Sequence, residues 1–324
     1  APDPVVVKHV DRCLSCLGCR TTCPSGVDYM RLVDHARSYI FKNYKRPIND
    51  RLFRRFILSL LVRPKLFRMA LWLGRPFGFM KNILPGRMGG LLAHLPERLP
   101  AAPPKKGGVH RPSSGVVSGK KIALLHGCAT AALGGEIHQA TIRLLTRMGH
   151  EVVMPQESGC CGALHHHAGD EDHARKLARR NVLAWKKAGI DAVVINASGC
   201  GTSVKDYAHL LKDSDCAEDA QWIAQHSFEI TQFLDSDQSW VAEATWQGRV
   251  AYHAPCSMQH GQRLIGVGER VLKRAGFDVV GLRDSHICCG SAGSYSLFQL
   301  KLRVNSSKKR LQILRERRQI FWQA

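Results

Sequence analysis

A duplicated cysteine pattern constrains the fold of this 324-residue chain more than any other feature of its sequence. Cys128 precedes the Cys160–Cys161 pair by 32 residues, and Cys256 precedes the Cys288–Cys289 pair by the same number. A glycine follows each pair, and the flanking sequences agree, GHEVVMPQESGCCG against GFDVVGLRDSHICCG. The common spacing, doublet and flanks indicate an internal repeat, so the chain should contain two copies of one structural unit.

Hydrophobic periodicity predicts the architecture of that unit. In the first copy, apolar runs predict strands at 120–126, 150–154 and 191–197, and helical spacing predicts helices at 136–148 and 170–189. Asp170 is placed as an N-cap, and Gly149 closes the earlier helix. In the second copy, strands are expected at 249–253 and 277–282, with a helix at 268–276. Alternating strands and helices predict a parallel α/β sheet in each copy.

Each strand of the repeat is followed by cysteine. Because ligands gather at the carboxyl ends of parallel strands, the thiols of one copy should meet at one sheet edge. The expected groups are Cys128, Cys160, Cys161 and Cys200 in the first copy, and Cys256, Cys288 and Cys289 in the second. A vicinal pair in a glycine-flanked turn presents both sulfurs to a polynuclear centre. This pattern favours a cluster or a thiol-redox site over a buried structural pair or a vicinal disulfide.

The second copy is expected to be incomplete. The counterpart of Cys200 would fall beyond Ala324, where the sequence stops. Segment 319–324 (QIFWQA) takes the place of the third strand, and the basic segment 308–319 is expected to be a helix that covers the sheet. We therefore expect a second unit that ends at the strand preceding its last cysteine.

The N-terminal segment carries the most specific motif in the sequence. Cys13, Cys16, Cys19 and Cys23, with Pro24, have the spacing C-x2-C-x2-C-x3-C-P. This spacing is typical of [4Fe-4S] ferredoxins, in which the fourth cysteine binds the other cluster of a pair. A structural zinc site is the rival interpretation, but zinc sites separate their cysteine pairs more widely. The motif occurs once, so a partner motif would have to lie outside this sequence or on another chain.

Most of the net charge of +21 lies in one quarter of the chain. Residues 42–121 hold 18 Lys and Arg and only two acids, Asp50 and Glu97, with Leu, Phe and Trp interleaved. Pro64, Pro76 and Pro85 should divide this segment into short helices, and 99–119 is expected to be an exposed linker. For this basic segment, contact with a partner subunit or an anionic membrane is the favoured interpretation. A solvated helical surface ranks second and nucleic acid third, so nucleic acid is not expected as a partner.

These observations predict an α/β protein in four parts. A small ferredoxin-like helical segment (1–45) is followed by a basic helical segment and linker (46–118), and then by two tandem α/β units (119–247 and 248–324). No apolar run reaches the roughly 20 residues of a spanning helix, and no signal peptide opens the sequence. A cytoplasmic location is expected, with a peripheral place at the inner face of the cytoplasmic membrane if the basic segment meets lipid.

Several other residues accompany these motifs. Structural hydrogen bonding is favoured over ligation for the histidines near the cysteines, His126, His165, His166, His167, His253 and His286. Cys216 fits no motif and is interpreted as a plain thiol. No catalytic residue is assigned, because neither a phosphate-binding loop nor a Ser/His/Asp arrangement is recognisable.

The sequence resembles the iron–sulfur subunits of glycolate oxidase (glycolate dehydrogenase). The motifs that carry the resemblance are TTCPSGV, ASGCGTSVKDY, YHAPCSMQH and SHICCGSAGSY, and it extends to about residue 303. The resemblance implies CCG domains for the two repeats and cluster ligation by Cys13, Cys16, Cys19 and Cys23. It further implies a possible additional iron–sulfur centre at the CCG cysteines, and partner subunits that carry FAD. Family members have a second ferredoxin motif and a final CCG cysteine; their absence suggests a truncated product.

The resemblance implies a subunit of an oxidoreductase complex that relays electrons from flavin through [4Fe-4S] clusters toward quinone. The flavin-bearing partners would oxidise glycolate to glyoxylate. Alternatives are a thiol–disulfide reductase of the heterodisulfide reductase B type, or the iron–sulfur subunit of lactate utilisation or of anaerobic glycerol-phosphate dehydrogenase. A more distant alternative is a metal-binding module that binds nucleic acid.

Overall fold

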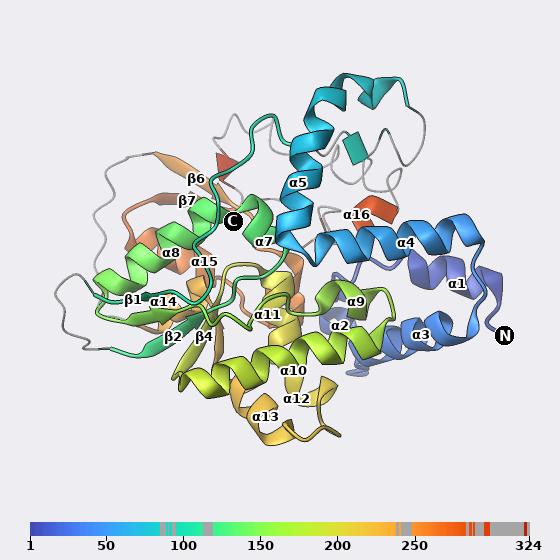
Figure 1. The fold of residues 1–324 in the computed structure, drawn as a ribbon. Helices are drawn as coiled ribbons and strands as arrows, with labels where there is room; N and C mark the ends of the chain where they lie inside the picture. The colour runs from blue at the N-terminus through green and yellow to red at the C-terminus, as the bar shows by residue number, and fades with distance from the viewer. Residues whose placement is uncertain are drawn as a thin grey trace.

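The computed structural model describes residues 1–84, 89, 91–92, 95–112, 119–237, 240, 248–282, 285–286, 288, 295–298 and 321–322 (Figure 1). The expected cysteine at 289, Pro85 and the expected helix 308–319 lie outside the described residues.

A five-stranded sheet carries the first copy of the repeat, with the strand order β1-β3-β2-β4-β5. Its strands are β1 (Val109–His110), β2 (Lys121–Leu124), β3 (Glu151–Val153), β4 (Ala192–Ile195) and β5 (Ser227–Glu229). Strands β2 to β5 pair in parallel, which confirms the α/β prediction.

Helices cover both faces of this sheet because alternate strand residues point to opposite sides. Ile122 and Leu124 pack with Leu145 on one face, whereas Ala123 packs with Trp185 on the other. Leu145 and Trp185 are fully buried, and burial of each stabilises the fold by about 2 kcal/mol. The covering helices are α8 (Gly135–Arg147), α10 (Glu171–Ala188), α12 (Tyr207–Leu210), α13 (Ala217–Gln225) and α14 (Ile230–Ser236).

The second copy repeats this strand order. Its sheet is ordered β7-β6-β8, and the matching strands of the first sheet are ordered β3-β2-β4. Strand β8 lies within the segment 319–324 and pairs in parallel with β6, as β4 pairs with β2. The structure therefore confirms the third-strand position expected for this segment. The elements of this copy are β6 (Arg249–Tyr252), the π-helix η2 (Ser257–Gly261), α15 (Val267–Arg274), β7 (Asp278–Val280), α16 (Tyr295–Phe298) and β8 (Phe321–Trp322).

The first 82 residues form a set of helices beside the first sheet (Figure 1). They are α1 (Pro4–Asp11), α2 (Gly18–Thr22), α3 (Tyr29–Asn43), α4 (Ile48–Leu61), α5 (Pro64–Gly74) and the 3-10 helix η1 (Arg75–Asn82). Proline divides them as expected, because Pro64 and Pro76 each stand in the first turn of a new helix, where a missing N–H costs nothing.

Two local expectations need correction. The linker 99–119 is not wholly irregular, since β1 within it pairs antiparallel with β3 and extends the sheet. Asp170 does stand at the N-cap of α10, but its side chain makes no capping bond. Its carboxylate instead accepts hydrogen bonds from His165 and His173, both at 2.9 Å. The two rings compete successfully for the oxygens that would otherwise cap the helix.

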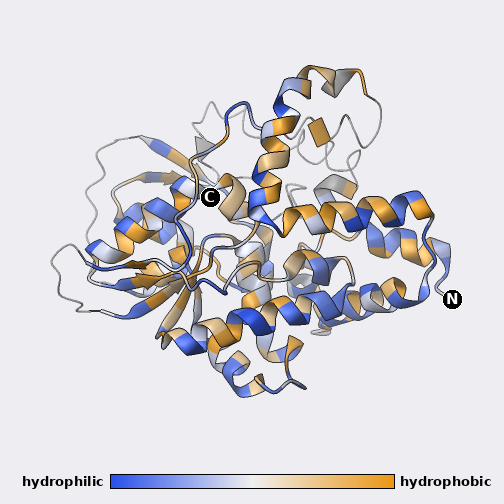
Figure 2. Cartoon of the chain, viewed as in Figure 1, coloured by the Kyte–Doolittle hydropathy of each residue, from blue (hydrophilic) through white to orange (hydrophobic). Residues whose placement is uncertain are grey.

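Hydropathy follows this layered arrangement. Figure 2 shows mainly hydrophobic strands in the first sheet and a hydrophilic outer side on α10. Within the described part of the chain, no helix is both long and apolar enough to cross a membrane.

Candidate cysteine sites

The first CCG group (Cys128, Cys160, Cys161 and Cys200) lies at the carboxyl edge of the first sheet, as expected for cysteines that follow parallel strands. Cys128 follows β2 and begins α7 (Ala129–Leu133). The Cys160–Cys161 pair follows β3 and precedes α9 (Ala163–His167). Cys200 lies in α11 (Ser198–Lys205), after β4. Cys128, Cys160 and Cys161 are at most 5% exposed, so water and bulky reactants are kept from their thiols.

These four thiols contact one another in a chain. Cys128 hydrogen-bonds to Cys160, Cys160 to Cys161, and Cys161 to Cys200. The Cys128 and Cys161 thiols hold the pKa of Cys160 well below its ordinary value, because they hydrogen-bond to its thiolate. The Gly162 N–H adds a further bond to the Cys160 Sγ atom at 3.5 Å. The structure thus brings together all four cysteines expected from the first copy.

A buried hydrogen-bond network holds the backbone of the vicinal pair. The Asn181 side chain accepts from the Gly159 N–H at 2.8 Å and donates to the Cys160 carbonyl at 2.9 Å. The Tyr207 hydroxyl donates to the Cys161 carbonyl at 2.8 Å. The Asn181 amide also donates to that hydroxyl. Sequence analysis missed both supporting residues, since neither adjoins a cysteine.

The N-terminal motif forms a loop with unusual backbone geometry. Ser15 and Leu17 have φ values of 52° and 60°, the left-handed region that non-glycine residues seldom occupy. These two residues turn the chain between Cys13 and Cys19. Such conformations persist only where the surroundings enforce them. Here Arg37 donates to the Ser15 hydroxyl at 2.6 Å and to the Cys13 carbonyl at 2.9 Å.

The four N-terminal cysteines do not share one environment. Burial raises the pKa of Cys16, and the nearby thiols of Cys288, Cys13 and Cys19 raise it further. The N–H of Val27 and other backbone amides instead hold the pKa of Cys23 below its ordinary value. The Cys23 thiol thus faces backbone N–H donors, whereas the Cys16 thiol is half-buried among other thiols.

Helix α3 joins this loop to the first CCG unit. Besides the Arg37 contacts, Ser38 donates to Glu171 in α10 at 3.0 Å, and Arg31 forms a bidentate ion pair with Asp206. Arg37 is only 8% exposed, and its backbone carbonyl lies where a Cβ at Gly169 would collide with it. The N-terminal motif is therefore fixed relative to the helices around the first thiol group.

The short helix η2 lies between the N-terminal motif and the first CCG unit. It begins directly after the buried Cys256. The Thr21 hydroxyl of α2 lies 2.7 Å from the His260 Nδ1 atom. The Ser257 hydroxyl donates to the Ser198 hydroxyl of α11 at 2.7 Å. Elements that carry cysteines of all three motifs thus meet at η2.

Cys288 is placed toward the N-terminal motif. Its thiol acts electrostatically on Cys16, and both Cys288 and Cys13 act on the Tyr295 hydroxyl. Sequence analysis had grouped this cysteine with Cys256 and did not anticipate the proximity to Cys16. The reason is that no local pattern encodes contact between segments so far apart in the chain.

Comparison with curated proteins supports a family assignment for these sites. The chain is 35% identical to the glycolate oxidase iron-sulfur subunit of Escherichia coli (strain K12) over 297 residues, covering 90% of this chain and 69% of that protein. It is 32% identical to the probable glycolate oxidase iron-sulfur subunit of Bacillus subtilis (strain 168), covering 93% of this chain and 71% of that protein. The chain belongs to the glycolate oxidase iron–sulfur subunit family.

A family model and a second group of relatives agree with the repeat. The cysteine-rich domain model, CCG, matches residues 122–205 and 250–321. Both copies of the repeat are therefore CCG domains. Lactate utilization protein A of Exiguobacterium sp. (strain ATCC BAA-1283 / AT1b) is 30% identical over 54% of this chain and 73% of that protein.

The cysteines present fit the iron–sulfur clusters that the family name implies. Thiolate sulfur is the donor that such clusters take. The first CCG group supplies four thiols that contact one another in a chain, and the N-terminal loop supplies three on a constrained backbone. The cysteines of the described residues are all free of disulfide bonds, Cys160 and Cys161 included. A vicinal disulfide, one of the alternatives from sequence, does not occur in this structure.

Two histidines near the first CCG group contact protein groups. His165 bonds to Asp170, and the buried His126 ring stacks on His138 with centroids 5.9 Å apart. Burial lowers the pKa of His126 to about 4, so its ring is neutral at physiological pH. Cys216 is buried in the core, with a hydrogen bond to Ser214 at 3.4 Å.

Proposed function

We propose that this chain is the electron-transfer iron–sulfur subunit of a flavin-dependent glycolate-oxidising complex. Oxidation of glycolate to glyoxylate releases two electrons and two protons. On this proposal it takes place on FAD-bearing partner subunits, and this chain passes the electrons singly toward quinone. No residue of this chain is given a role in abstracting a proton from glycolate.

The main support for the proposal is that elements carrying cysteines of all three motifs meet at η2. Helices α2 and α11, which hold Cys19 and Cys200, both contact the helix that begins after Cys256. Clusters bound at these cysteines would supply one-electron carriers within a single packed unit. The chain's own part is to fix the carriers' spacing through hydrogen-bonded helices and to exclude water by burying Cys128, Cys160 and Cys161.

The proposed cluster ligands are the cysteines of the sequence motifs. Cys13, Cys16, Cys19 and Cys23 are proposed as [4Fe-4S] ligands, Cys23 toward a cluster whose other ligands lie elsewhere. The CCG cysteines at 128, 160, 161, 200, 256, 288 and 289 are proposed to hold further iron–sulfur centres. The four-part division at residues 1–45, 46–118, 119–247 and 248–324 stays part of this proposal.

Anaerobic purification with iron and acid-labile sulfide analysis tests the assignment. Dithionite reduction should give an EPR signal of a reduced cubane, and the iron and sulfide should be present in cluster amounts. Zinc in place of iron, or a metal-free protein with disulfide-bonded CCG cysteines, would contradict it. Capture of flavin-bearing glycolate oxidase subunits by the iron-loaded chain is the second expected result.

A thiol–disulfide reductase is the second candidate, favoured by the low pKa of Cys160 among contacting thiols. Burial of the site argues against it, because electrons can reach a buried sulfur whereas a bulky disulfide cannot. Reduction of a disulfide substrate by the reduced chain alone, without flavin subunits, would favour this candidate over the relay.

A further inference from the structure

An arm formed by α5 and η1 (residues 64–82) exposes a group of large apolar side chains. Met69, Trp72, Leu73, Phe77 and Phe79 are between 52% and 71% exposed. Single exposed apolar residues are ordinary on protein surfaces, but a contiguous group of this kind marks an interaction site. The arm also projects from the body of the molecule (Figure 1), so this surface is open to a large partner.

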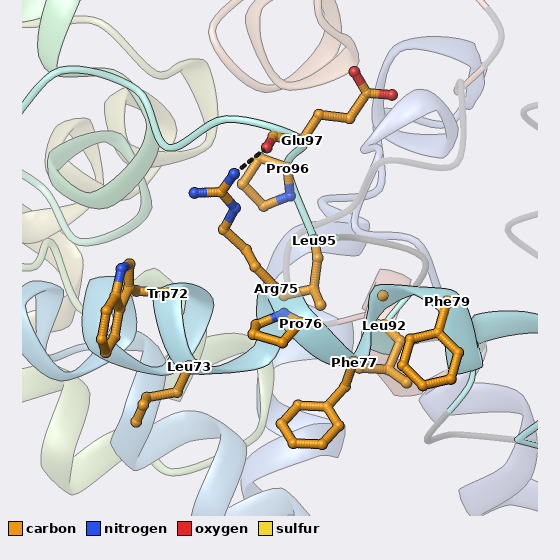
Figure 3. A pocket seen from close by; sticks show the side chains of 11 residues that line it. Trp72, Leu73, Arg75, Pro76, Phe77, Phe79, Leu92, Leu95, Pro96 and Glu97 are labelled. Carbon is orange, nitrogen blue, oxygen red and sulfur yellow. Dashed lines mark hydrogen bonds between the residues drawn. The ribbon is translucent and has the colours of Figure 1, made fainter.

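The arm encloses an apolar pocket of about 860 Å³. Trp72, Phe77 and Phe79 line it from the arm, and Leu95 with Pro96 lines it from the returning chain (Figure 3). Its basic group, Arg75, donates to the Glu97 carbonyl at 2.7 Å. The pocket is therefore suited to hydrocarbon chains, with a cation at its border.

The charge around the arm is predominantly positive, and the exposed Glu97 is the one acid among the residues that line the pocket. Residues 51–96 contain no Asp or Glu at all. Lys65 and Arg75 on the arm are exposed, as are Arg63 just before it and Arg51 and Arg55 on the adjoining α4. Exposed cations interleaved with exposed aromatic and aliphatic groups match the two layers of a bilayer surface, anionic headgroups above acyl chains.

We propose that the arm docks this chain onto an anionic lipid bilayer. Its apolar group and pocket enter the upper acyl region, and the surrounding arginines and lysines meet lipid phosphates. A bilayer fits better than nucleic acid, because the exposed aliphatic side chains of Met69 and Leu73 offer nothing for bases to stack on, whereas acyl chains can bury them. It fits better than a protein partner, because the predominantly positive charge matches the negative charge that anionic lipid carries over its whole surface. The inference goes beyond the proposed function and does not depend on cluster binding.

The arm is attached firmly to the first CCG unit. Arg68 of α5 donates to the Ala132 carbonyl of α7 at 2.8 Å and to the Pro100 carbonyl at 3.0 Å. Helix α7 starts directly after Cys128. Docking would therefore place the first thiol group at a fixed position relative to the membrane.

Vesicle flotation with the full chain tests the proposal. Binding should be at least tenfold tighter to vesicles of phosphatidylcholine with phosphatidylglycerol than to phosphatidylcholine alone, and should weaken as salt rises. Trp72→Ser with Phe79→Ser should weaken binding roughly tenfold or more. The matched control, Ile265→Ser, removes a residue that is 73% exposed but outside the arm, and should bind as the unaltered chain does.

Tryptophan quenching by brominated phosphatidylglycerol locates the contact. Trp72→Phe keeps an apolar ring, so it should still bind but lose most of the quenching. Trp222→Phe is the control, since Trp222 is 39% exposed on α13, at the opposite end of the molecule from α5 (Figure 1).

Three results would overturn the proposal: equal binding to both vesicle types, quenching that survives Trp72→Phe, or loss of vesicle binding once flavin subunits are attached. Preference for duplex DNA over anionic vesicles would do so as well. The iron content of the same sample reports on the proposed function separately and does not enter these outcomes.

Discussion

The Thr21 hydroxyl and the His260 Nδ1 atom lie 2.7 Å apart although 239 residues separate them in the chain. This contact joins the N-terminal cysteine loop to the second CCG domain. Arg20 adds a weaker hydrogen bond to the Gly261 carbonyl at 3.4 Å. The interface between α2 and η2 is small and polar, so its few hydrogen bonds should matter for how firmly the two motifs are held together.

Removing the His260 ring should loosen the N-terminal loop without unfolding the protein. In His260→Ala, amide hydrogen exchange of residues 13–23 should speed up, while the first CCG domain keeps its protection. His226→Ala is a suitable control, because its ring bonds only locally, to the Trp222 carbonyl. Unchanged exchange in residues 13–23 of His260→Ala would show that this contact does not hold the loop.

Tyr207→Phe should destabilise the first CCG domain by about 1–3 kcal/mol, since it leaves the Cys161 carbonyl and the Asn181 amide short of a buried partner. Urea unfolding measures the effect. Tyr39→Phe makes the same chemical change at a tyrosine that is 51% exposed, and should be close to neutral. Equal stabilities for the two variants would contradict the supporting role of Tyr207.

Cys200 and Cys216 belong to the same core cluster. Substituting each in turn therefore distinguishes the loss of a metal ligand from a disturbance of packing. Cys200→Ser should weaken retention of iron against a chelator by roughly tenfold or more, as expected for a lost ligand. Cys216→Ser removes a thiol from the same core cluster but outside the CCG motifs, and should retain iron normally. If both variants lost iron alike, the effect would come from disturbed packing.

Gly162→Ala should destabilise the folded protein, because the backbone at this position favours glycine. Gly162 has φ near 90°, and a Cβ there would lie 2.9 Å from the Ala174 carbonyl oxygen. Gly189→Ala also requires a left-handed residue, at φ 61°, but meets no atom within 4 Å. We expect a loss of about 1 kcal/mol for Gly189→Ala and clearly more for Gly162→Ala, measured by thermal unfolding.

Glu229 should give the protein a distinctive pH dependence. Burial raises its pKa from 4.5 to about 7, so the folded state binds a proton that the unfolded state has lost between these values. Stability contributed by this group therefore falls as pH rises from about 4.5 to 7 and is constant above. The whole effect is roughly 3 kcal/mol at most.

The comparison with Glu229→Gln isolates this effect, because buried histidines such as His126 titrate in the opposite sense over part of the same range. The difference in unfolding free energy between Glu229→Gln and the unaltered chain should grow in favour of Gln from pH 4.5 to 7. A difference that stays flat over this range would mean that Glu229 ionises normally.

The sequence predicted the repeated sheets well because their signals are local. Spacing between cysteines and runs of apolar residues located the three strands of each copy that lead toward a cysteine position, including β8 in the segment 319–324. Strand β5 at the edge of the first sheet was not expected, because its three residues, Ser-Phe-Glu, contain no apolar run. Strand β1 was missed because two residues in a Pro- and Gly-rich linker carry too little periodicity to be recognised.

The sequence predicted the contacts between motifs less well. The four thiols from Cys128 to Cys200 were expected to meet, since strand order alone brings them to one edge. The supports from Asn181 and Tyr207, and the approach of Cys288 to Cys16, depend on how separate elements pack. Spacing within a motif carries no information on such packing.

The hydrogen bond from Arg68 to the Ala132 carbonyl has a consequence for geometry on a larger scale. Helix α7 is five residues long, so about 7 Å of helix separates its two ends. The arm and the first sheet are therefore joined over a short distance, through α7. A surface that the arm grips would lie at the α5 end of the molecule, and the α13 end would face away from it (Figure 1).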